Sequence, residues 1–368
     1  MSPATTDRRA NNLDFIRIIL ASLVILSHST QLIDGNSSRE PLARITPDAI
    51  SLGFMAVNGF FLISGFLIVQ SWLLTGDLFK YLLKRILRIY PGFIAASLVS
   101  IAIAGAFGAA HAASYWGAMD GHYLWFCFKR LAALRVPSTP PTFVGLPYPA
   151  VNGAIWTVRY EFCCYLMVAA LGLFGVCKRR SLVLALAIGS YLAYVAQANG
   201  LLTLGGADLP VLGVISNWPR FASYFLGGMC FYLFRDKLRL DGKIALGCGL
   251  AVAAGCAWRG FSSVVLPVFG AYLLFYFAFL RAGRLHDFGK RGDYSYGIFC
   301  YGWPVQNCVL WAFHGKLDPI VFFFISFPVA LLLAFCSWHI IEKPSLRLRA
   351  RRPPAPITVP EMPEGAPP

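Results

Sequence analysis

Five ionisable side chains lie inside long apolar stretches of this sequence, where a charge is costly unless it serves a purpose. They are Arg17, His28, Arg159, Glu161 and Arg220. Charged groups within membrane-spanning segments are rare and mark sites of catalysis or transport. An imidazole is the side chain best suited to moving a proton near neutral pH. The set therefore predicts acid–base chemistry, and the alternative is ion pairing that only holds the helices together.

Arg17 and His28 share one face of the first apolar stretch. They are eleven residues apart, which makes about three helical turns and about 16 Å along the axis. Glu161 lies about eight residues into a later apolar stretch, which predicts a depth similar to that of His28. A carboxylate at that depth would orient the imidazole ring and favour its protonation. We therefore predict that His28, Arg17 and Glu161 form a catalytic set.

A second chemical feature is the basic cluster that runs from Lys84 to Arg88 and is followed by Tyr90 and Pro91. Arg85 and Arg88 are three residues apart, so they are neighbours on a helix. Such a pair can bind a phosphate group through several charge-assisted hydrogen bonds. The alternative is an ordinary cytoplasmic anchor next to a membrane helix.

The composition identifies the elements that must position these groups. Of the 368 residues, 57% are hydrophobic and 13% are charged, with a mean hydropathy of +0.62. Soluble domains carry roughly 25% charged residues, so we expect an all-α polytopic transmembrane bundle of about ten helices in a lipid bilayer.

The net charge of +15 does not indicate nucleic-acid binding, because the basic residues occur in short clusters between apolar stretches. The ten cysteines include no CxxC pair and mostly lie in apolar stretches, as packing residues do.

Ten apolar stretches are candidate membrane spans of roughly 20 residues each. They cover residues 14–34, 52–74, 91–113, 153–175, 181–203, 214–234, 244–259, 262–281, 294–314 and 319–341. Residues 115–135 are aromatic but interrupted by Asp120, Lys129 and Arg130, so we expect them to lie in the membrane interface.

The distribution of Lys and Arg predicts the orientation. With both termini in the cytoplasm, 22 of the 32 basic residues fall in cytoplasmic segments and 7 in outer segments, which is the positive-inside pattern. We divide the chain into a cytoplasmic N-terminus (1–13), a membrane domain (14–344) and a basic, then Pro-rich, disordered cytoplasmic tail (345–368). The outer segment 114–152 ends in a Pro-rich loop, which is either a lid or a connector.

Six motifs in sequence order resemble those of the membrane acyltransferases called acyltransferase family 3, and together they cover about nine-tenths of the chain. The first is Asp14-x-x-Arg17 with His28, and the second is the block from Asn58 to Ile68 that contains Ser64 and Gly65. The others are Arg85-x-x-Arg88-x-x-Pro91, the block Asn152–Tyr165 with Glu161, Tyr294-Ser295-Tyr296-Gly297 with Trp303-Pro304, and Ile341-Glu342-Lys343-Pro344. Many relatives carry a His where this chain has Gly302, so His28 is left as the strongest acid–base candidate.

The resemblance implies an O-acyltransferase of a bacterial inner (cytoplasmic) membrane, with acetyl as the expected acyl group. It would move an acyl group from cytoplasmic acetyl-CoA, or another acyl-CoA, to a hydroxyl of a glycan acceptor such as a surface polysaccharide. No metal is expected. Arg85 and Arg88 would bind the CoA phosphates, and the acyl-pantetheine arm would pass Ser64 and Gly65 on its way to His28. The rival function is a transporter or flippase for a glycan or lipid-linked intermediate, since buried charges also line transport paths.

Overall fold

The computed structural model describes residues 11–280, 285, 288–289 and 292–348. Within these residues the chain is mostly helical, and its one sheet consists of two antiparallel strands, β1 (Asp208–Leu209) and β2 (Gly213–Val214). The expected all-α class is therefore confirmed. Most of the predicted N-terminal segment and tail, residues 1–10 and 349–368, lie outside the described residues.

The long helices follow the apolar stretches, and short helical turns join several of them. The α-helices are α1 (Leu13–Asp34), α2 (Pro41–Ile45), α3 (Leu52–Thr75), α4 (Leu78–Ile103), α5 (Ala112–Gly117), α6 (Gly121–Ala132), α7 (Val158–Leu173), α8 (Arg180–Ala198), α9 (Trp218–Leu233), α10 (Gly242–Cys256), α11 (Ser262–Val265), α12 (Ala271–Phe279), α13 (Ser295–Ala312), α14 (Pro319–Ser337) and α15 (Lys343–Arg347). The turns are η1 (Ala104–Gly108), η2 (Ile155–Thr157), η3 (Val176–Lys178), η4 (Ile215–Asn217), η5 (Leu266–Gly270) and η7 (Trp338–Glu342).

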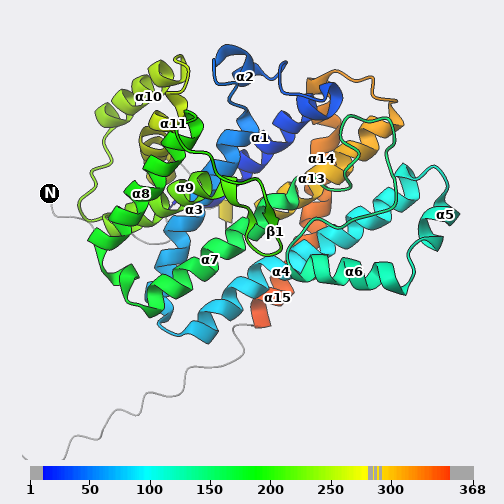
Figure 1. Ribbon diagram of the computed structural model, residues 1–368, viewed down its shortest axis with the longest axis horizontal. Coiled ribbons are helices and arrows are strands. Elements are labelled where there is room, and N and C mark those ends of the chain that lie inside the picture. Colours follow the sequence, from blue (N-terminus) through cyan, green and yellow to red (C-terminus); the bar gives the residue numbers. More distant parts are fainter. Residues whose placement is uncertain (1–10, 281–284, 286–287, 290–291, 349–368) are drawn as a thin grey trace, which may run out of the picture.

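The helices form one bundle around α1 and α3. Helix α1 packs between α3 and α13, α3 packs on α9, and α14 covers α13. Helices α8, α10 and α11 lie at one edge of the bundle, and α5 and α6 lie at the opposite edge (Figure 1). The center of the bundle is thus built from α1, α3, α9 and α13, together with parts of α4 and α7.

The closest helix crossing, between α3 and α9, depends on two glycines. A Cβ atom on Gly65 would lie 1.9 Å from the carbonyl oxygen of Phe225, and one on Gly228 would lie 2.0 Å from that of Leu62. Small residues allow such backbone contact between membrane helices, where van der Waals packing takes the place of hydrophobic association. The structure therefore gives Gly65 a packing role between two helices.

The predicted number of ten spans is not confirmed. Each of the ten apolar stretches contains a helix, but six helical segments are long and apolar enough to cross a membrane among the residues described. They are Leu13–Asp34, Leu52–Thr75, Leu78–Gly108, Arg180–Ala198, Ser262–Phe279 and Pro319–Arg347. Helices α7, α9 and α10 have only 15 or 16 residues, and α13 carries Gln306 and Asn307 in its buried face.

Helix α4 begins much earlier than its apolar stretch predicts. The predicted span starts at residue 91, whereas α4 starts at Leu78, where the side chain of Asp77 accepts a hydrogen bond from the Lys80 amide at 2.7 Å. A capping carboxylate satisfies an amide that would otherwise lack a partner in the first turn. The basic motif therefore lies within this long helix, at Arg85 and Arg88, rather than before it.

The aromatic segment 115–135 forms the end of α5 and all of α6. Several apolar side chains of α6 are exposed, including Trp125 at 57% and Phe128 at 59%. The Lys129 ammonium lies 5.6 Å from the center of the Trp125 ring. A location in the membrane interface remains a prediction, with which this pattern agrees.

Candidate active site

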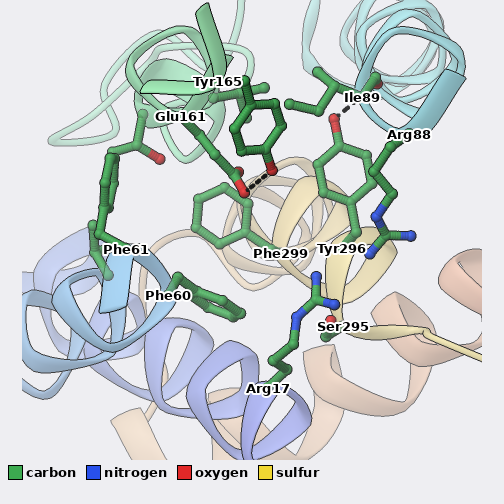
Figure 2. A pocket seen from close by; sticks show the side chains of 13 residues that line it. Arg17, Phe60, Phe61, Arg88, Ile89, Glu161, Tyr165, Ser295, Tyr296 and Phe299 are labelled. Carbon is green, nitrogen blue, oxygen red and sulfur yellow. Dashed lines mark hydrogen bonds between the residues drawn. The ribbon is translucent and has the colours of Figure 1, made fainter. Parts of the chain in front are cut away.

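A small cavity of about 40 Å³ lies in the center of the bundle. Its polar side chains come from α1, α4, η2, α7 and α13. Figure 2 shows Arg17 and Arg88 near one another with Ser295 and Tyr296. The remaining wall is mostly aromatic and aliphatic. The full lining is Arg17, Val57, Phe60, Phe61, Arg88, Ile89, Thr157, Val158, Glu161, Tyr165, Ser295, Tyr296 and Phe299.

Arg17 and Arg88 share one carboxylate, that of Asp293. Oδ2 of Asp293 accepts a hydrogen bond from Arg17 at 2.6 Å and another from Arg88, and its Oδ1 accepts one from the Ser295 hydroxyl at 2.5 Å. Burial would raise the pKa of Asp293, but the two guanidinium groups outweigh it and hold that pKa well below its usual range. We call Arg17, Arg88 and Asp293 the charge clamp.

A second carboxylate lies close to the charge clamp. Glu342 is 3% exposed and accepts a hydrogen bond from the Ser337 hydroxyl at 3.1 Å. One turn beyond Arg88, a Cβ atom on Gly92 would lie 3.3 Å from Cγ of Glu342. Two guanidinium groups and two carboxyl groups therefore meet where α1, α4, the start of α13 and η7 come together.

The two arginines of the basic motif point to different partners. Arg88 joins the charge clamp, whereas Arg85 lies over the rings of Tyr81 and Tyr165, with its guanidinium carbon 5.8 Å from the center of the Tyr165 ring. The two guanidinium groups are therefore not arranged in this structure to bind one phosphate group together, as the sequence predicted. Arg88 instead shares the Asp293 carboxylate with Arg17, which lies 71 positions earlier in the chain.

Glu161 faces the cavity, but it does not contact His28. It accepts hydrogen bonds from the hydroxyls of Ser64 at 2.8 Å and Tyr165 at 2.5 Å, and neither an ion pair nor a hydrogen bond joins these two described residues. The predicted pairing is not formed because α7 begins at Val158, five residues later than its apolar stretch. Glu161 therefore lies near the start of its helix, at a depth that matches Ser64 in the middle of α3.

His28 lies near the C-terminal end of α1, against Trp303. The two ring centers are 4.9 Å apart in an edge-to-face arrangement. Its Nδ1 atom is buried and has no hydrogen-bond partner among the residues that the structure describes, although the side chain as a whole keeps some exposure. The imidazole is therefore held by packing, and no carboxylate of the described residues bonds to its Nδ1 atom.

The Pro-rich loop before α7 covers this end of the bundle. Tyr148 donates to the carbonyl of Gly35 at 2.9 Å, and the Ala150 carbonyl accepts from the indole of Trp303 at 2.9 Å. Asn152 donates to the carbonyl of Cys300 at 2.8 Å. The loop is thus tied to both α1 and α13 close to His28.

The other two arginines of the predicted spans, Arg159 and Arg220, lie outside the cavity lining. Arg159 forms an ion pair with Asp208 of β1 at 2.8 Å, and Arg135 binds the same carboxylate at 2.8 Å. The guanidinium of Arg220 lies 4.8 Å from the center of the Phe54 ring and 4.5 Å from that of Phe221. Ion pairing is thus seen for Arg159, and cation–π contacts surround Arg220.

Sequence reasoning missed Asp293 and Tyr165 as site residues. Asp293 directly precedes the Tyr294–Gly297 motif, but it follows a polar segment in which an acidic residue attracts no attention. Tyr165 closes the Glu161 block at a spacing of four residues, which places both side chains on one helix face. That spacing was the available signal for Tyr165.

Comparisons with known proteins agree with the resemblance seen in the motifs. Residues 10–339 match the acyltransferase domain of acyltransferase family 3. The chain is 22% identical to the O-acetyl transferase of Shigella phage Sf6 over 347 residues, which covers 91% of this chain and 96% of that protein. It is 25% identical to nodulation protein 10 of Rhizobium leguminosarum bv. viciae over 367 residues, covering 92% and 94%.

No solved structure was found to match the chain. The family assignment therefore depends on sequence, and the apolar helices agree with it. A match over residues 10–339 includes both ends of α1, the cavity and the charge clamp. The chain belongs to acyltransferase family 3, and it is a multi-pass membrane O-acyltransferase.

Proposed function

We propose that this O-acyltransferase moves an acetyl group from cytoplasmic acetyl-CoA to a hydroxyl of a glycan, in a bacterial inner membrane with both termini in the cytoplasm. The observation that carries the proposal is the layout of α1. Arg17 meets Arg88 near its N-terminal end, and His28 lies about 16 Å further along the axis, beneath the loop 137–152. Both termini on the cytoplasmic side would place the charge clamp on the donor side.

The donor would bind through charge. The phosphates of CoA are multiply charged anions, and Arg guanidinium groups recognise such oxygens through paired hydrogen bonds. Arg17 and Arg88 are held in place by Asp293, and Arg85 lies one turn away on α4. The acyl-pantetheine arm would then extend along α1 between α3 and α13, past Ser64 and Glu161.

His28 would act as the general base. It accepts the proton of the acceptor hydroxyl while the hydroxyl oxygen attacks the thioester carbonyl carbon. The new C–O bond forms as the C–S bond breaks, and the CoA thiolate takes the proton back from His28. Two observations support this role: Nδ1 of His28 has no hydrogen-bond partner among the described residues, and the residue is partly exposed. A well-placed base contributes roughly 10²–10⁴-fold to the rate.

The test compares cells that carry the protein with cells that lack it. Mass spectrometry of their surface glycans should show acetyl esters only when the protein is present. Purified protein should release free CoA from acetyl-CoA only when glycan from the unmodified cells is added. Movement of glycan across the membrane without any acyl change would overturn the proposal and favour the transporter.

A further inference from the structure

A second pocket, of about 360 Å³, lies near the C-terminal end of α1. Ser37 lines it three residues after that helix ends, and the loop from α2 to α3, the end of α8 and the start of α11 complete its wall. Small-molecule sites usually measure roughly 300–1,000 Å³, so the pocket has the size of a ligand site. It shares no lining residue with the cavity beside the charge clamp. We call it the polar pocket.

The lining of the polar pocket matches the chemistry of a neutral sugar residue. Four serines and the carboxylate of Asp48 line it, together with the rings of Phe54 and Tyr194. A sugar residue presents hydroxyl groups, which donate and accept hydrogen bonds, and its apolar C–H faces pack on aromatic rings. Asp48 is the one charged residue among those that line the pocket, so a phosphate or carboxylate group would meet a like charge there.

Asp48 keeps acceptor capacity for such a ligand. Its Oδ1 atom accepts a hydrogen bond from the Gly260 amide at 2.7 Å, and its Oδ2 atom accepts one from the Ser262 hydroxyl at 2.5 Å. An ionised carboxylate has about four lone-pair positions, so these two bonds do not exhaust its capacity. They also join the α2–α3 loop to the start of α11, which fixes the carboxylate in the pocket wall.

The α2–α3 loop is held in an uncommon conformation beside the pocket. Ala49, which lines the pocket, has a φ of 50°, in the left-handed region that residues with a side chain rarely adopt. The Ala49 amide donates to the Thr46 carbonyl at 2.9 Å, and the Ile50 amide donates to the Thr46 hydroxyl at 2.9 Å. Such strained residues cluster at binding sites, and a wall that is already ordered loses less entropy when a ligand binds.

The polar pocket lies next to the turn of α1 that carries His28. Ser51 and Phe54 line the pocket at the start of α3. Between them in the chain lies Gly53, where an added Cβ atom would be 2.9 Å from the hydroxyl oxygen of Ser27. Ser27 directly precedes His28 on α1. The first turn of α3 therefore borders the pocket and also contacts α1 beside His28.

A short segment after α1 joins the polar pocket to the loop that covers His28. The Gly35 carbonyl accepts a hydrogen bond from Tyr148 of that loop at 2.9 Å. The Tyr148 ring center lies 6.1 Å from that of Trp303, which packs against His28. Ser37, two residues after Gly35, lines the polar pocket. This segment borders both places, so linked sugars held in the pocket would extend along it toward His28.

We propose that the polar pocket binds a neutral sugar residue of the acceptor glycan, other than the residue whose hydroxyl reacts at His28. The inference rests on the proposed function, because it takes a glycan as the acceptor. The pocket holds a neighbouring residue of the same glycan, and it therefore increases the affinity for acceptors that are long enough to occupy both places. Its residues take no part in the bond-making step.

The experiment measures KM and kcat for acceptors of different length, with acetyl-CoA as the donor. Surface glycan from cells that lack the protein is partly hydrolysed and separated by size, from single sugars to long fragments. For wild-type protein, KM per sugar residue should fall at least tenfold from the shortest acylated fragment to the longest, with little change in kcat. Only the longer fragments fill the polar pocket. A KM per residue that is the same at every length would overturn the inference.

Two substitutions test the pocket itself. Ala198→Trp places an indole in the pocket from an exposed position at the end of α8, and it should abolish the gain from length. Asp48→Asn removes the charge of the acceptor group but keeps an oxygen for the Gly260 amide, and it should raise KM for long fragments about tenfold. Neither should change kcat/KM for the shortest fragment. The matched control is Ala185→Trp, at an exposed position of α8 outside the pocket lining, and it should keep the gain.

The outcomes separate this inference from the proposed function. If wild-type protein acylates no fragment, the proposed function fails. If it acylates the fragments and both Ala198→Trp and Asp48→Asn keep the full gain from length, the function stands and the polar pocket is not a sugar site. Loss of the gain in either folded variant, with Ala185→Trp unchanged, supports the inference. A thermal unfolding curve in detergent checks that each variant is folded.

Discussion

The two ends of α1 differ in how their polar side chains are balanced. Near the N-terminal end, Arg17 forms an ion pair with Asp293, and the same carboxylate forms an ion pair with Arg88. Near the C-terminal end, His28 contacts an aromatic ring, and its buried nitrogen has no partner among the described residues. The comparison teaches that one end holds its charges in fixed ion pairs, whereas the other leaves an imidazole nitrogen without a partner among the described residues.

The largest expected effect comes from a substitution near the C-terminal end of α1. His28→Ala should lower O-acylation by roughly 10²–10⁴-fold, because it removes the proposed base. The assay is release of free CoA in the presence of glycan acceptor, together with a thermal unfolding curve in detergent. His111→Ala, at an exposed position before α5, is the control and should retain activity. Normal acylation by folded His28→Ala protein would refute the role of His28.

The next effect concerns stability at the N-terminal end. Asp293→Ala leaves two neighbouring guanidinium groups without their shared carboxylate, and loss of one partner in a buried pair costs roughly 3–5 kcal/mol. Asp236→Ala provides the matched control, because Asp236 pairs with Arg180 at the surface, where a pair is worth about 1 kcal/mol or less. Denaturant unfolding in detergent measures both. Equal losses of unfolding free energy in the two variants would show that the charge clamp stabilises the fold no more than a surface ion pair does.

A smaller effect tests whether the charge clamp binds the donor. Arg88→Lys keeps the positive charge beside Asp293 but loses the planar fork that binds phosphate oxygens through two bonds. We expect KM for acetyl-CoA to rise about tenfold, as the loss of a charge-assisted hydrogen bond would cause, with a smaller change in kcat. Arg180→Lys at the surface should change neither. An unaltered KM would place the CoA phosphates elsewhere.

A still smaller effect tests whether Glu161 acts on His28 during catalysis. Since Glu161 binds Ser64 and Tyr165, Glu161→Gln should leave the pH profile of kcat in place and lower the rate less than tenfold. Measurement of kcat from pH 5 to pH 9 checks this. A shifted profile would show that the carboxylate reaches the imidazole during turnover.

The smallest effect is a predicted absence of pH dependence. The guanidinium groups hold the pKa of Asp293 below its ordinary value of 3.8, so its contribution to stability is complete above that value and is lost only at lower pH. The neighbouring Glu342 carboxyl also interacts with this cluster, so both proteins carry Glu342→Gln, and the difference in unfolding free energy caused by Asp293→Asn should then be the same at pH 7 and pH 5. A difference that shrinks at pH 5 would mean that the carboxyl is already taking up a proton.

The sequence predicted the helices better than their ends. Apolar length predicts where helices form, and each of the ten stretches contains one, although only six helical segments among the described residues are long and apolar enough to cross a membrane. It does not reveal that Asp77 caps α4 ahead of a basic cluster, or that α7 starts only at Val158. These starts decide depth, which is why the expected approach of Glu161 to His28 did not occur.

The sequence predicted which residues belong to the candidate site better than it predicted the contacts between them. The one-faced stripe of Arg17 and His28 follows from helical periodicity, and both lie on α1. The partnership of Arg17 with Arg88 and Asp293 joins three distant parts of the chain, and only packing brings them together. Local spacing carries no information about such a contact.

The glycine crossing of α3 and α9 has a consequence for how the bundle can open. With backbone against backbone at Gly65 and Gly228, these two helices have no side-chain layer through which to slide. They therefore move as one body, and Phe60, Phe61 and Ser64 move with them. We therefore expect any opening of the bundle to displace α1, α4 or α13 relative to this close-packed pair of helices.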